Sequence, residues 1–466
     1  MTARRVDHRA VRAQHPEGVL RAVYDYAALD SAQTCGIRYD GRALDARVGE
    51  PLALSLLANG IDTLSRSVKF HRPRGPMCLR GNCEGCLTRV DDDPNTMACV
   101  ARAHDGREIR SQNAFPSAEL DVLRITDWFF PKSFDHHHLM VRYGPAINQV
   151  MQSFARKMAG LGTLPTRASE PMAPLAMDCD VLVVGLGPAG LALAAQCAQA
   201  GLKVVAVDEE PDVGGFLRDS LQWHTHEGAR VCAPAWCDLQ LAKLRALGVS
   251  VRLGAAACAT FDDGTLVITG ERALWVRARA RVFANGSHES VGNFENNDLP
   301  GIYTERAVAR ALRQGVRVGA TVLLTGGSDE TDALALALSH TDATVHRVQP
   351  GETLRGAKGM GDVSGAVLVG PKGERTVSCD AIGAENVRTP AFELAGQAGV
   401  EPRASLTRRC FVAHSHEAGR TERRDVFVVG SVRSEGDTRE PDWDATVSAS
   451  VIALCKETAA QTGASR

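Results

Sequence analysis

Hydrophobic positions along this chain gather in short runs that end at glycines. In "DVLVVGLGPAGLALAAQCAQAGLKVVAVDEE" (180–210), an apolar run leads into a glycine-rich turn, a helical stretch closed by Gly201, and a second apolar run ending in Asp208. Runs of this length bounded by glycines predict a strand, a helix and a second strand. A similar order returns in "ATVLLTGGSDETDALALALSHTDATVHRV" (320–348), and "RRDVFVVGSV" (423–432) predicts one more buried strand. Strands that alternate with helices predict a parallel α/β sheet.

The pattern near the N-terminus is different. Residues 36–47, "GIRYDGRALDAR", alternate between polar and apolar positions around Asp40 and Gly41, which predicts a β-hairpin. "PLALSLLANG" (51–60) then predicts a short helix that begins near Pro51 and ends at Gly60. A hairpin, a helix and a following cysteine-rich loop are the order of a small β-grasp, ferredoxin-like domain.

Four cysteines follow this helix at the spacing C-x4-C-x2-C-x12-C. They are Cys78, Cys83, Cys86 and Cys99. Three thiolates from one loop and a fourth from farther on are typical of a plant-type 2Fe-2S cluster, and Gly81 and Gly85 let the loop wrap closely around it. A structural zinc site more often has two C-x2-C pairs or histidine ligands. Zinc and simple packing thiols remain the alternatives at this point.

The basic stretch "KFHRPRGP" (69–76) precedes the cysteine loop. It predicts either contact with a partner or a cofactor phosphate, or a solvated loop.

The βαβ unit at 180–210 carries Gly185-x-Gly187-x-x-Gly190, followed 18 residues later by Asp208. The three glycines allow a tight turn, approach of the backbone to a pyrophosphate, and close packing of helix on strand, while Asp208 is placed to accept ribose hydroxyls. The candidate cofactor-binding residues are Gly185, Gly187, Pro188, Ala189, Gly190, Asp208, Glu209, Gly215, Ala284, Gly286 and Gly430.

The second βαβ-like unit lacks two of the three glycines. Aligning its strand with the first places Gly326 over Gly185, Ser328 over Gly187 and Thr331 over Gly190. Asp329 and Glu330 lie in the turn, where they favour the helix dipole and repel a phosphate. We therefore predict a Rossmann-like unit without a nucleotide, which disfavours an NAD(P)H-driven reductase.

Composition adds few constraints. The chain has 466 residues, a formal charge of −2 and 13 cysteines. The near-neutral charge argues against nucleic-acid or membrane-surface binding, and an odd number of cysteines without a secretory signal argues against a disulfide framework. We expect a cytoplasmic protein with neither nucleic acid nor membrane as a partner.

Taken together, these motifs resemble one family. "VGEPLALSLLANGID" (48–62), the cysteine loop and "FANGSHESVGNFENNDLPGIYTERAV" (283–308) are similar to alpha subunits of multi-subunit amine dehydrogenases and oxidases, such as sarcosine oxidase, opine and D-hydroxyproline dehydrogenases and hydrogen cyanide synthase. The resemblance implies a β-grasp 2Fe-2S domain followed by a glutathione-reductase-like fold with two dinucleotide-binding domains. It also implies that the four cysteines ligate the cluster and that the glycine loop and Asp208 hold the dinucleotide.

The family's division of labour implies partners for this chain. An amino-acid-oxidase-type FAD beta subunit would oxidise the amine, with FMN between the subunits and, in some members, a small additional subunit. This chain would then relay electrons, and no residue in it is expected to be catalytic. Two other functions stay open, a stand-alone NAD(P)H-dependent iron–sulfur flavoprotein reductase and a non-redox nucleotide-binding scaffold.

The dinucleotide itself is open to two interpretations. The late strand ends in Gly430-Ser431, where flavoproteins usually have Gly-Asp, so NAD is the alternative to the favoured FAD. The expected domains are an N-terminal extension (1–35), the ferredoxin-like domain (36–125), a helical linker (126–177), the dinucleotide-binding domain (178–313 and 389–466) and an inserted Rossmann-like domain (314–388).

Overall fold

The structure is a computed structural model. It describes residues 4–14, 26–67, 70–122, 144, 146–150, 165, 172–270, 272–386, 388–406, 409–433 and 443–464. The chain forms two compact units, Met1–Ser169 with Ser290–Asn386, and Glu170–Glu289 with Val387–Arg466. Most of the expected linker at 126–177, and part of the expected extension at 1–35, lie outside the described residues. The described part of that extension holds α1 (His8–Gln14) and α3 (Tyr26–Ser31).

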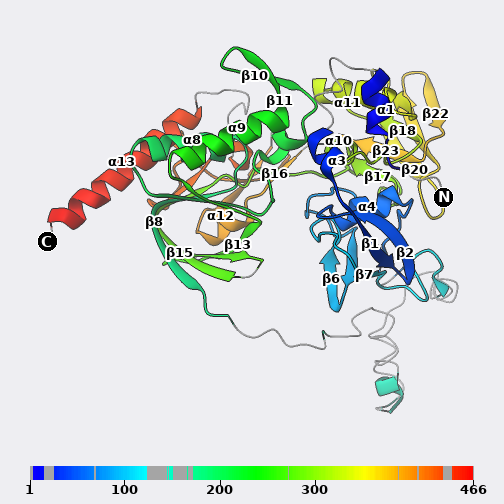
Figure 1. Ribbon diagram of the computed structural model, residues 1–466, viewed down its shortest axis with the longest axis horizontal. Coiled ribbons are helices and arrows are strands. Elements are labelled where there is room, and N and C mark those ends of the chain that lie inside the picture. Colours follow the sequence, from blue (N-terminus) through cyan, green and yellow to red (C-terminus); the bar gives the residue numbers. More distant parts are fainter. Residues whose placement is uncertain are drawn as a thin grey trace. The chain divides into compact units, whose positions relative to one another are not determined.

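The first unit begins with a mixed five-stranded sheet in the order β2-β1-β7-β5-β6 (Figure 1). Its strands are β1 (Thr34–Tyr39), β2 (Arg42–Arg47), β5 (Leu87–Val90), β6 (Asp93–Met97) and β7 (Arg107–Arg110). β1 and β2 form the predicted hairpin, because Tyr39 pairs with Arg42 across the two-residue turn of Asp40 and Gly41. The predicted helix is α4 (Leu52–Ala58), whose side chains are all buried. A short ladder of β3 (Ser65–Arg66) and β4 (Pro73–Arg74) leads into the cysteine loop.

The segment 290–386 of the same unit contains a parallel four-stranded sheet in the order β17-β23-β18-β19. These strands are β17 (Ile302–Thr304), β18 (Thr321–Leu324), β19 (Thr344–Arg347) and β23 (Ala381–Ala384). Helices α10 (Glu305–Arg313) and α11 (Asp329–Ser339) follow β17 and β18. An antiparallel sheet is added by β20 (Thr353–Lys358), β21 (Gly365–Gly370) and β22 (Gly373–Val377).

The second unit is built on a seven-stranded sheet in the order β12-β9-β8-β15-β14-β13, with β27 beside β15. The parallel strands β8 (Leu175–Val184), β9 (Val204–Asp208), β12 (Ser250–Leu253), β15 (Arg272–Phe283) and β27 (Val426–Val428) form its nucleotide-binding part. The strands β13 (Ala255–Thr260) and β14 (Thr265–Thr269) extend it as an antiparallel meander.

Alternate residues of these strands face two separate cores. Val181 and Val183 pack against α8 (Pro188–Gln199), α9 (Ala233–Ala246) and α13 (Trp443–Ala464). Leu182 and Val184 face the other side, where α12 (Glu393–Gln397) contributes Leu394. A sheet buried on both faces explains why the sequence of β8 is an unbroken apolar run.

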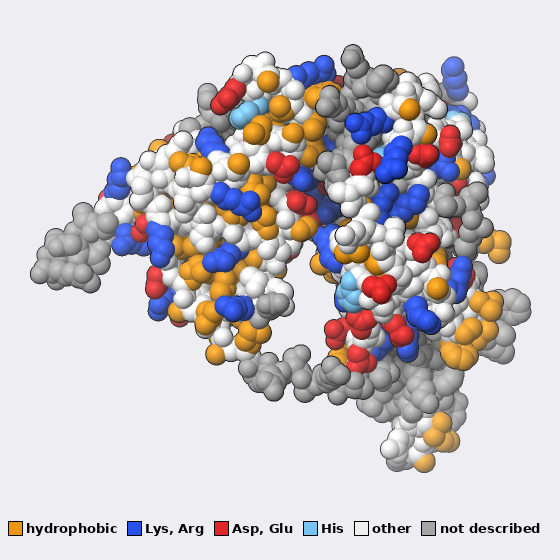
Figure 2. Space-filling model, viewed as in Figure 1, with side chains coloured by type: hydrophobic (Ala, Val, Ile, Leu, Met, Phe, Trp, Pro, Cys, Tyr) orange, Lys and Arg blue, Asp and Glu red, His pale blue; other side chains and the backbone are white. Residues whose placement is uncertain are grey.

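The distribution of charged side chains on the surface agrees with the small net charge of the chain. On the face shown in Figure 2, basic and acidic side chains lie side by side over each unit. Among the described residues, no helix is long and apolar enough to cross a membrane.

Candidate cofactor sites

The cysteine loop joins β4 to β5 without regular structure and folds back on itself. Gly85 lies so close to Gly75 that a Cβ on Gly85 would be 2.1 Å from the Gly75 carbonyl oxygen. Only glycine allows this approach, because the obstructing atom belongs to the backbone. The reversal of the loop brings Cys78, Cys83 and Cys86 near Cys99, which follows β6.

The four thiols form two pairs. The Sγ atoms of Cys86 and Cys99 are 3.4 Å apart, and the Cys78 thiol hydrogen-bonds to Cys83. Within the part of the chain that the structure describes, no three of these sulfurs belong to a group of metal-binding atoms all within 4.8 Å of one another. A tetrahedral zinc site needs all four sulfurs about 3.8 Å from each other. Two pairs fit a binuclear centre better, since each iron takes two thiolates.

Backbone N–H groups of the loop point at these sulfurs. Gly81 N–H donates to Cys99 Sγ (3.2 Å), and the N–H groups of Arg80 and Asn82 donate to Cys78 Sγ (3.4 and 3.3 Å). Such donors stabilise negative charge on sulfur and tune the potential of a bound cluster.

Each pair has a donor and an acceptor thiol. The hydrogen bond from Cys78, with backbone donors, lowers the pKa of Cys83 to about 6, and the hydrogen bond from Cys86 lowers the pKa of Cys99. The pKa values of Cys78 and Cys86 are raised, first by donating these bonds and then by burial. Cys83 and Cys99 are thus the thiols that ionise more readily, and the thiolate is the form that binds metal.

The basic stretch before the loop has a structural role within the first unit. Arg72 donates through Nε and one terminal nitrogen to the two carboxylate oxygens of Asp298, both at 2.7 Å, and Arg74 donates to the same carboxylate. Met77, the residue before Cys78, accepts a hydrogen bond from the Thr304 N–H (3.0 Å). The cysteine loop is therefore anchored to segment 290–386 through Arg72 and Arg74, and the predicted contact of this stretch with a partner or a cofactor phosphate stays a prediction.

In the second unit the glycine loop lies between β8 and α8. A Cβ on Gly190 would be 1.9 Å from the Gly185 carbonyl oxygen, and one on Gly185 would be 2.4 Å from that of Ala284. A Cβ on Gly187 would meet nothing within 4 Å, so this residue borders open space at the N-terminus of α8. Pro188 and Ala189 form the first turn of that helix. The arrangement leaves helical N–H groups free to face a pyrophosphate.

Asp208 lies at the end of β9 as predicted and also has a structural role, while its contact with a ribose stays a prediction. Its two oxygens accept hydrogen bonds from the backbone N–H groups of Leu186 (2.6 Å) and Glu210 (2.9 Å). Burial raises the pKa of Asp208 to about 6 despite these bonds. The carboxylate thus ties the glycine loop to the end of β9, while the neighbouring Glu209 is exposed.

The other candidate residues come to the same place. Gly214 N–H donates to the Leu186 carbonyl (2.8 Å), which brings the Gly214-Gly215 turn onto the glycine loop. Gly286 lies beside Ser431, the residue after Gly430, because a Cβ on Gly286 would be 3.8 Å from Oγ of Ser431.

Sequence reasoning passed over Asn285. Its side-chain oxygen is buried and has no hydrogen-bond partner in the structure. It follows Ala284, which forms one wall of the glycine loop. A buried carbonyl oxygen without a donor is costly, and a cofactor hydroxyl or N–H can satisfy it. The signal in the sequence was a polar residue between two small residues at the end of β15.

In the corresponding loop of segment 290–386, protein side chains accept hydrogen bonds from several backbone N–H groups. Glu305 accepts hydrogen bonds from the Gly326 N–H (2.7 Å) and the Thr331 hydroxyl (2.5 Å), and Glu385 accepts one from the Gly327 N–H (3.3 Å). Ser328 caps α11 through the Thr331 N–H. Burial raises the pKa of Glu305 to about 7. Two carboxylates therefore lie against this loop and disfavour a phosphate there.

Comparisons with known domains agree with this geometry. A model of the 2Fe-2S iron–sulfur cluster binding domain matches residues 32–114, and a model of an FAD binding domain matches residues 180–223. The predicted fold class and the predicted 2Fe-2S and FAD cofactors are confirmed.

Comparisons over longer stretches of the chain find relatives of the kind that the sequence motifs resemble. The alpha chain of sarcosine oxidase from Rhizobium meliloti is 28% identical over 420 residues, covering 80% of this chain and 42% of that protein. The corresponding chain of opine oxidase from Agrobacterium tumefaciens is 24% identical, covering 54% and 60%. The crystal structure of L-proline dehydrogenase from P. horikoshii aligns with a TM-score of 0.66 at 20% identity, covering 93% and 74%. The resemblance to alpha subunits of the sarcosine oxidase type is confirmed, although this chain spans less than half of the sarcosine oxidase alpha chain.

Proposed function

We propose that this chain is the electron-transfer, cofactor-bearing subunit of a hetero-oligomeric amine dehydrogenase or oxidase. The substrate class is a sarcosine-, opine- or amino-acid-like amine, and its C–N bond is oxidised on a partner subunit. The observation that carries the proposal is the set of two thiol pairs, Cys78 with Cys83 and Cys86 with Cys99, on a chain that also has a flavin-binding glycine loop. Similarity to subunits of sarcosine and opine oxidases supports it.

In this proposal Cys78 and Cys83 hold one iron, and Cys86 and Cys99 hold the other. A 2Fe-2S cluster held by these residues would accept electrons singly from a two-electron flavin donor. Gly81 N–H and its neighbours stabilise the added negative charge on the sulfurs. For FAD, the first turn of α8 binds the pyrophosphate, Glu209 reaches the ribose hydroxyls, and Asn285 accepts from the cofactor.

The partner we propose is an amino-acid-oxidase-type FAD subunit, with FMN between the subunits and a small third subunit as a further member of the complex. We place the complex in the cytoplasm. The rival function, an NAD(P)H-dependent reductase, requires a nicotinamide nucleotide in segment 290–386. Glu305 and Glu385 disfavour it, because their carboxylates lie at the N–H groups that a pyrophosphate would need.

The experiment uses the complex isolated anaerobically from its native host through an affinity tag on this chain. Sarcosine, proline and an opine are each added, and flavin bleaching and the electron paramagnetic signal of a reduced 2Fe-2S cluster are recorded. We expect an amine to reduce both centres in the complex, and neither amine nor NADH to reduce them in the isolated, cofactor-loaded chain. Rapid reduction of the isolated chain by NADH would instead establish the reductase function. A native preparation without iron would support the scaffold.

A further inference from the structure

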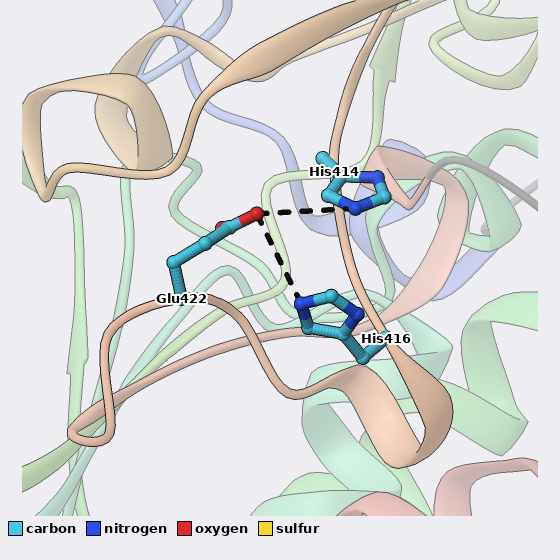
Figure 3. Close-up of side chains that lie close together, drawn as sticks. All are labelled: His414, His416 and Glu422. Carbon is cyan, nitrogen blue, oxygen red and sulfur yellow. Dashed lines mark ion pairs between the residues drawn. The ribbon is translucent and has the colours of Figure 1, made fainter.

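A group of three potential metal ligands lies in the second unit, far along the sequence from the cysteine loop. Figure 3 shows His414, His416 and Glu422 pointing toward one another. The Nε2 atoms of His414 and His416 are 3.8 and 3.9 Å from the same Glu422 carboxylate oxygen, and the three ligand atoms all lie within 4.8 Å of one another. Two imidazoles and one carboxylate are a common ligand set for zinc.

The backbone holds the two imidazoles on one side. His414 directly follows β26 (Cys410–Ala413), and His416 is in an extended conformation (φ −81°, ψ −170°). In extended backbone, residues i and i+2 face the same way. The His414 N–H donates to the Glu401 carbonyl (3.3 Å), and the His416 N–H donates to the Arg420 carbonyl (2.8 Å), so both positions are fixed.

The return segment that carries Glu422 is equally constrained. Gly419 is buried, and a Cβ there would be 2.4 Å from the Val428 carbonyl oxygen of β27. The Thr421 hydroxyl donates to the Val426 carbonyl (2.9 Å). The three ligands therefore come from a turn packed on the core sheet and need only small side-chain rotations to meet an ion. Zinc bonds of about 2.0–2.2 Å place tetrahedral ligands roughly 3.4 Å apart.

Two arginines lie near the site: Arg403 pairs with Glu422, and Arg433 donates through Nε to Oγ of Ser415 (3.4 Å), the residue between the two histidines. Arg403 lies on β25 (Pro402–Ser405), and Glu401 directly precedes that strand. The Arg403 guanidinium is 3.7 Å from the Glu422 carboxylate and 3.5 Å from that of Glu401. When Glu422 turns to a metal, Arg403 keeps Glu401 as its partner. The side chains of His414, His416 and Glu422 are 21, 59 and 40% exposed, which leaves access for the ion and for a fourth, water ligand.

We propose that His414, His416 and Glu422 form a three-ligand zinc site that pins the 414–422 turn beside β27. This site is independent of the electron-transfer function. It is distinct in chemistry from the thiol pairs, since nitrogen and oxygen ligands suit Zn²⁺ and thiolates suit the iron–sulfur cluster.

The test titrates Zn²⁺ into the iron- and FAD-loaded chain, without a polyhistidine tag, and follows heat and bound zinc after desalting. We expect one zinc per chain that His416→Ala and Glu422→Gln abolish or weaken at least about tenfold. His288→Ala is the matched control, because His288 pairs with a single carboxylate, that of Glu393 (3.6 Å). The His288→Ala chain should bind zinc as the unaltered chain does.

Hydrogen exchange gives a second measurement that does not depend on total zinc content. Zinc should slow exchange of the 414–422 amides in the unaltered chain and in His288→Ala, and leave it unchanged in His416→Ala. The proposal is overturned if the loaded chain binds no zinc, or if His416→Ala and His288→Ala bind it equally well. Both variants alter exposed side chains, so misfolding does not account for either result.

Discussion

Asp298→Asn tests whether the ion pairs of Asp298 with Arg72 and Arg74 anchor the cysteine loop. Asp298 receives a two-pronged contact from Arg72 and a second contact from Arg74, both located a few residues before Cys78. Asparagine keeps the size of the side chain but removes its charge and one of its acceptor oxygens. The two guanidinium groups are then left with a neutral partner.

The magnitude follows from the pKa of Asp298. Although burial raises it, hydrogen bonds from Arg72 and Arg74 lower the pKa from 3.8 to about 2. At about 1.36 kcal/mol per unit, this difference corresponds to roughly 2.4 kcal/mol in favour of the folded state. Because Asp298 and Arg72 are 27 and 42% exposed, solvent screening reduces the expected value to about 1–2 kcal/mol.

The sign with pH is fixed by the direction of the shift. A carboxylate with a lowered pKa contributes its stability above its unfolded value, and that contribution is lost as the pH falls from 3.8 toward 2. Asp298→Asn should therefore cost the same amount throughout pH 5–8, and the difference from the unaltered chain should shrink only in more acidic solution.

The assay is hydrogen exchange of the amides in residues 70–80, which reports the local free energy of opening. Glu374→Gln is the matched control, since Glu374 forms an ion pair with Arg355 in which both side chains are more than half exposed. We expect the control to change protection by less than about 0.5 kcal/mol. Equal effects of the two variants, or none for Asp298→Asn, would refute the reasoning.

Three further predictions concern the cofactor sites. Cys83→Ser should remove the visible absorbance and paramagnetic signal of the cluster while bound FAD, released by heating and quantified, is retained; an unchanged iron signal would contradict the proposed ligands. Gly190→Ala should release FAD by separating α8 from Gly185, measured as flavin per chain, with iron content unchanged in the separate first unit. Glu305→Gln should remove a pH dependence of stability. Because burial raises the pKa of Glu305 from 4.5 to about 7, the unaltered chain should lose up to about 3 kcal/mol of stability as the pH rises from 4.5 to 7. Hydrogen exchange of the amides around Gly326 should show this loss in the unaltered chain and not in Glu305→Gln.

The local parts of this structure follow from the sequence because they depend on neighbours in the chain. The turn at Asp40 and Gly41, helix α4, and the close approach of Gly190 to Gly185 all depend on residues fewer than ten positions apart, and they form as predicted. The spacing of the four cysteines likewise identified the loop that brings their sulfurs together.

Contacts between distant residues were the part that the sequence did not reveal. Asp298 is 226 positions from Arg72, and nothing in either segment indicates the pairing. Asp208 was placed correctly at the end of β9, but its carboxylate is taken by backbone donors that only the folded loop presents. Asn285 has only a weak sequence signal, a polar residue between two small ones, because an unsatisfied buried oxygen is visible only when its surroundings are known.

In the second Rossmann-like loop, Glu305 adds a carboxylate to the two acids that the sequence indicated, Asp329 and Glu330. Asp329 and Glu330 simply begin α11, whereas the carboxylate on the Gly326 N–H is that of Glu305, twenty-one positions earlier. Glu305 follows Thr304, whose N–H holds Met77 beside the first cysteine. One short segment thus supports the cluster loop with its backbone and fills the nucleotide loop with its side chain. This Rossmann-like fold has a physical use here, because it supports the loop that carries the four cysteines.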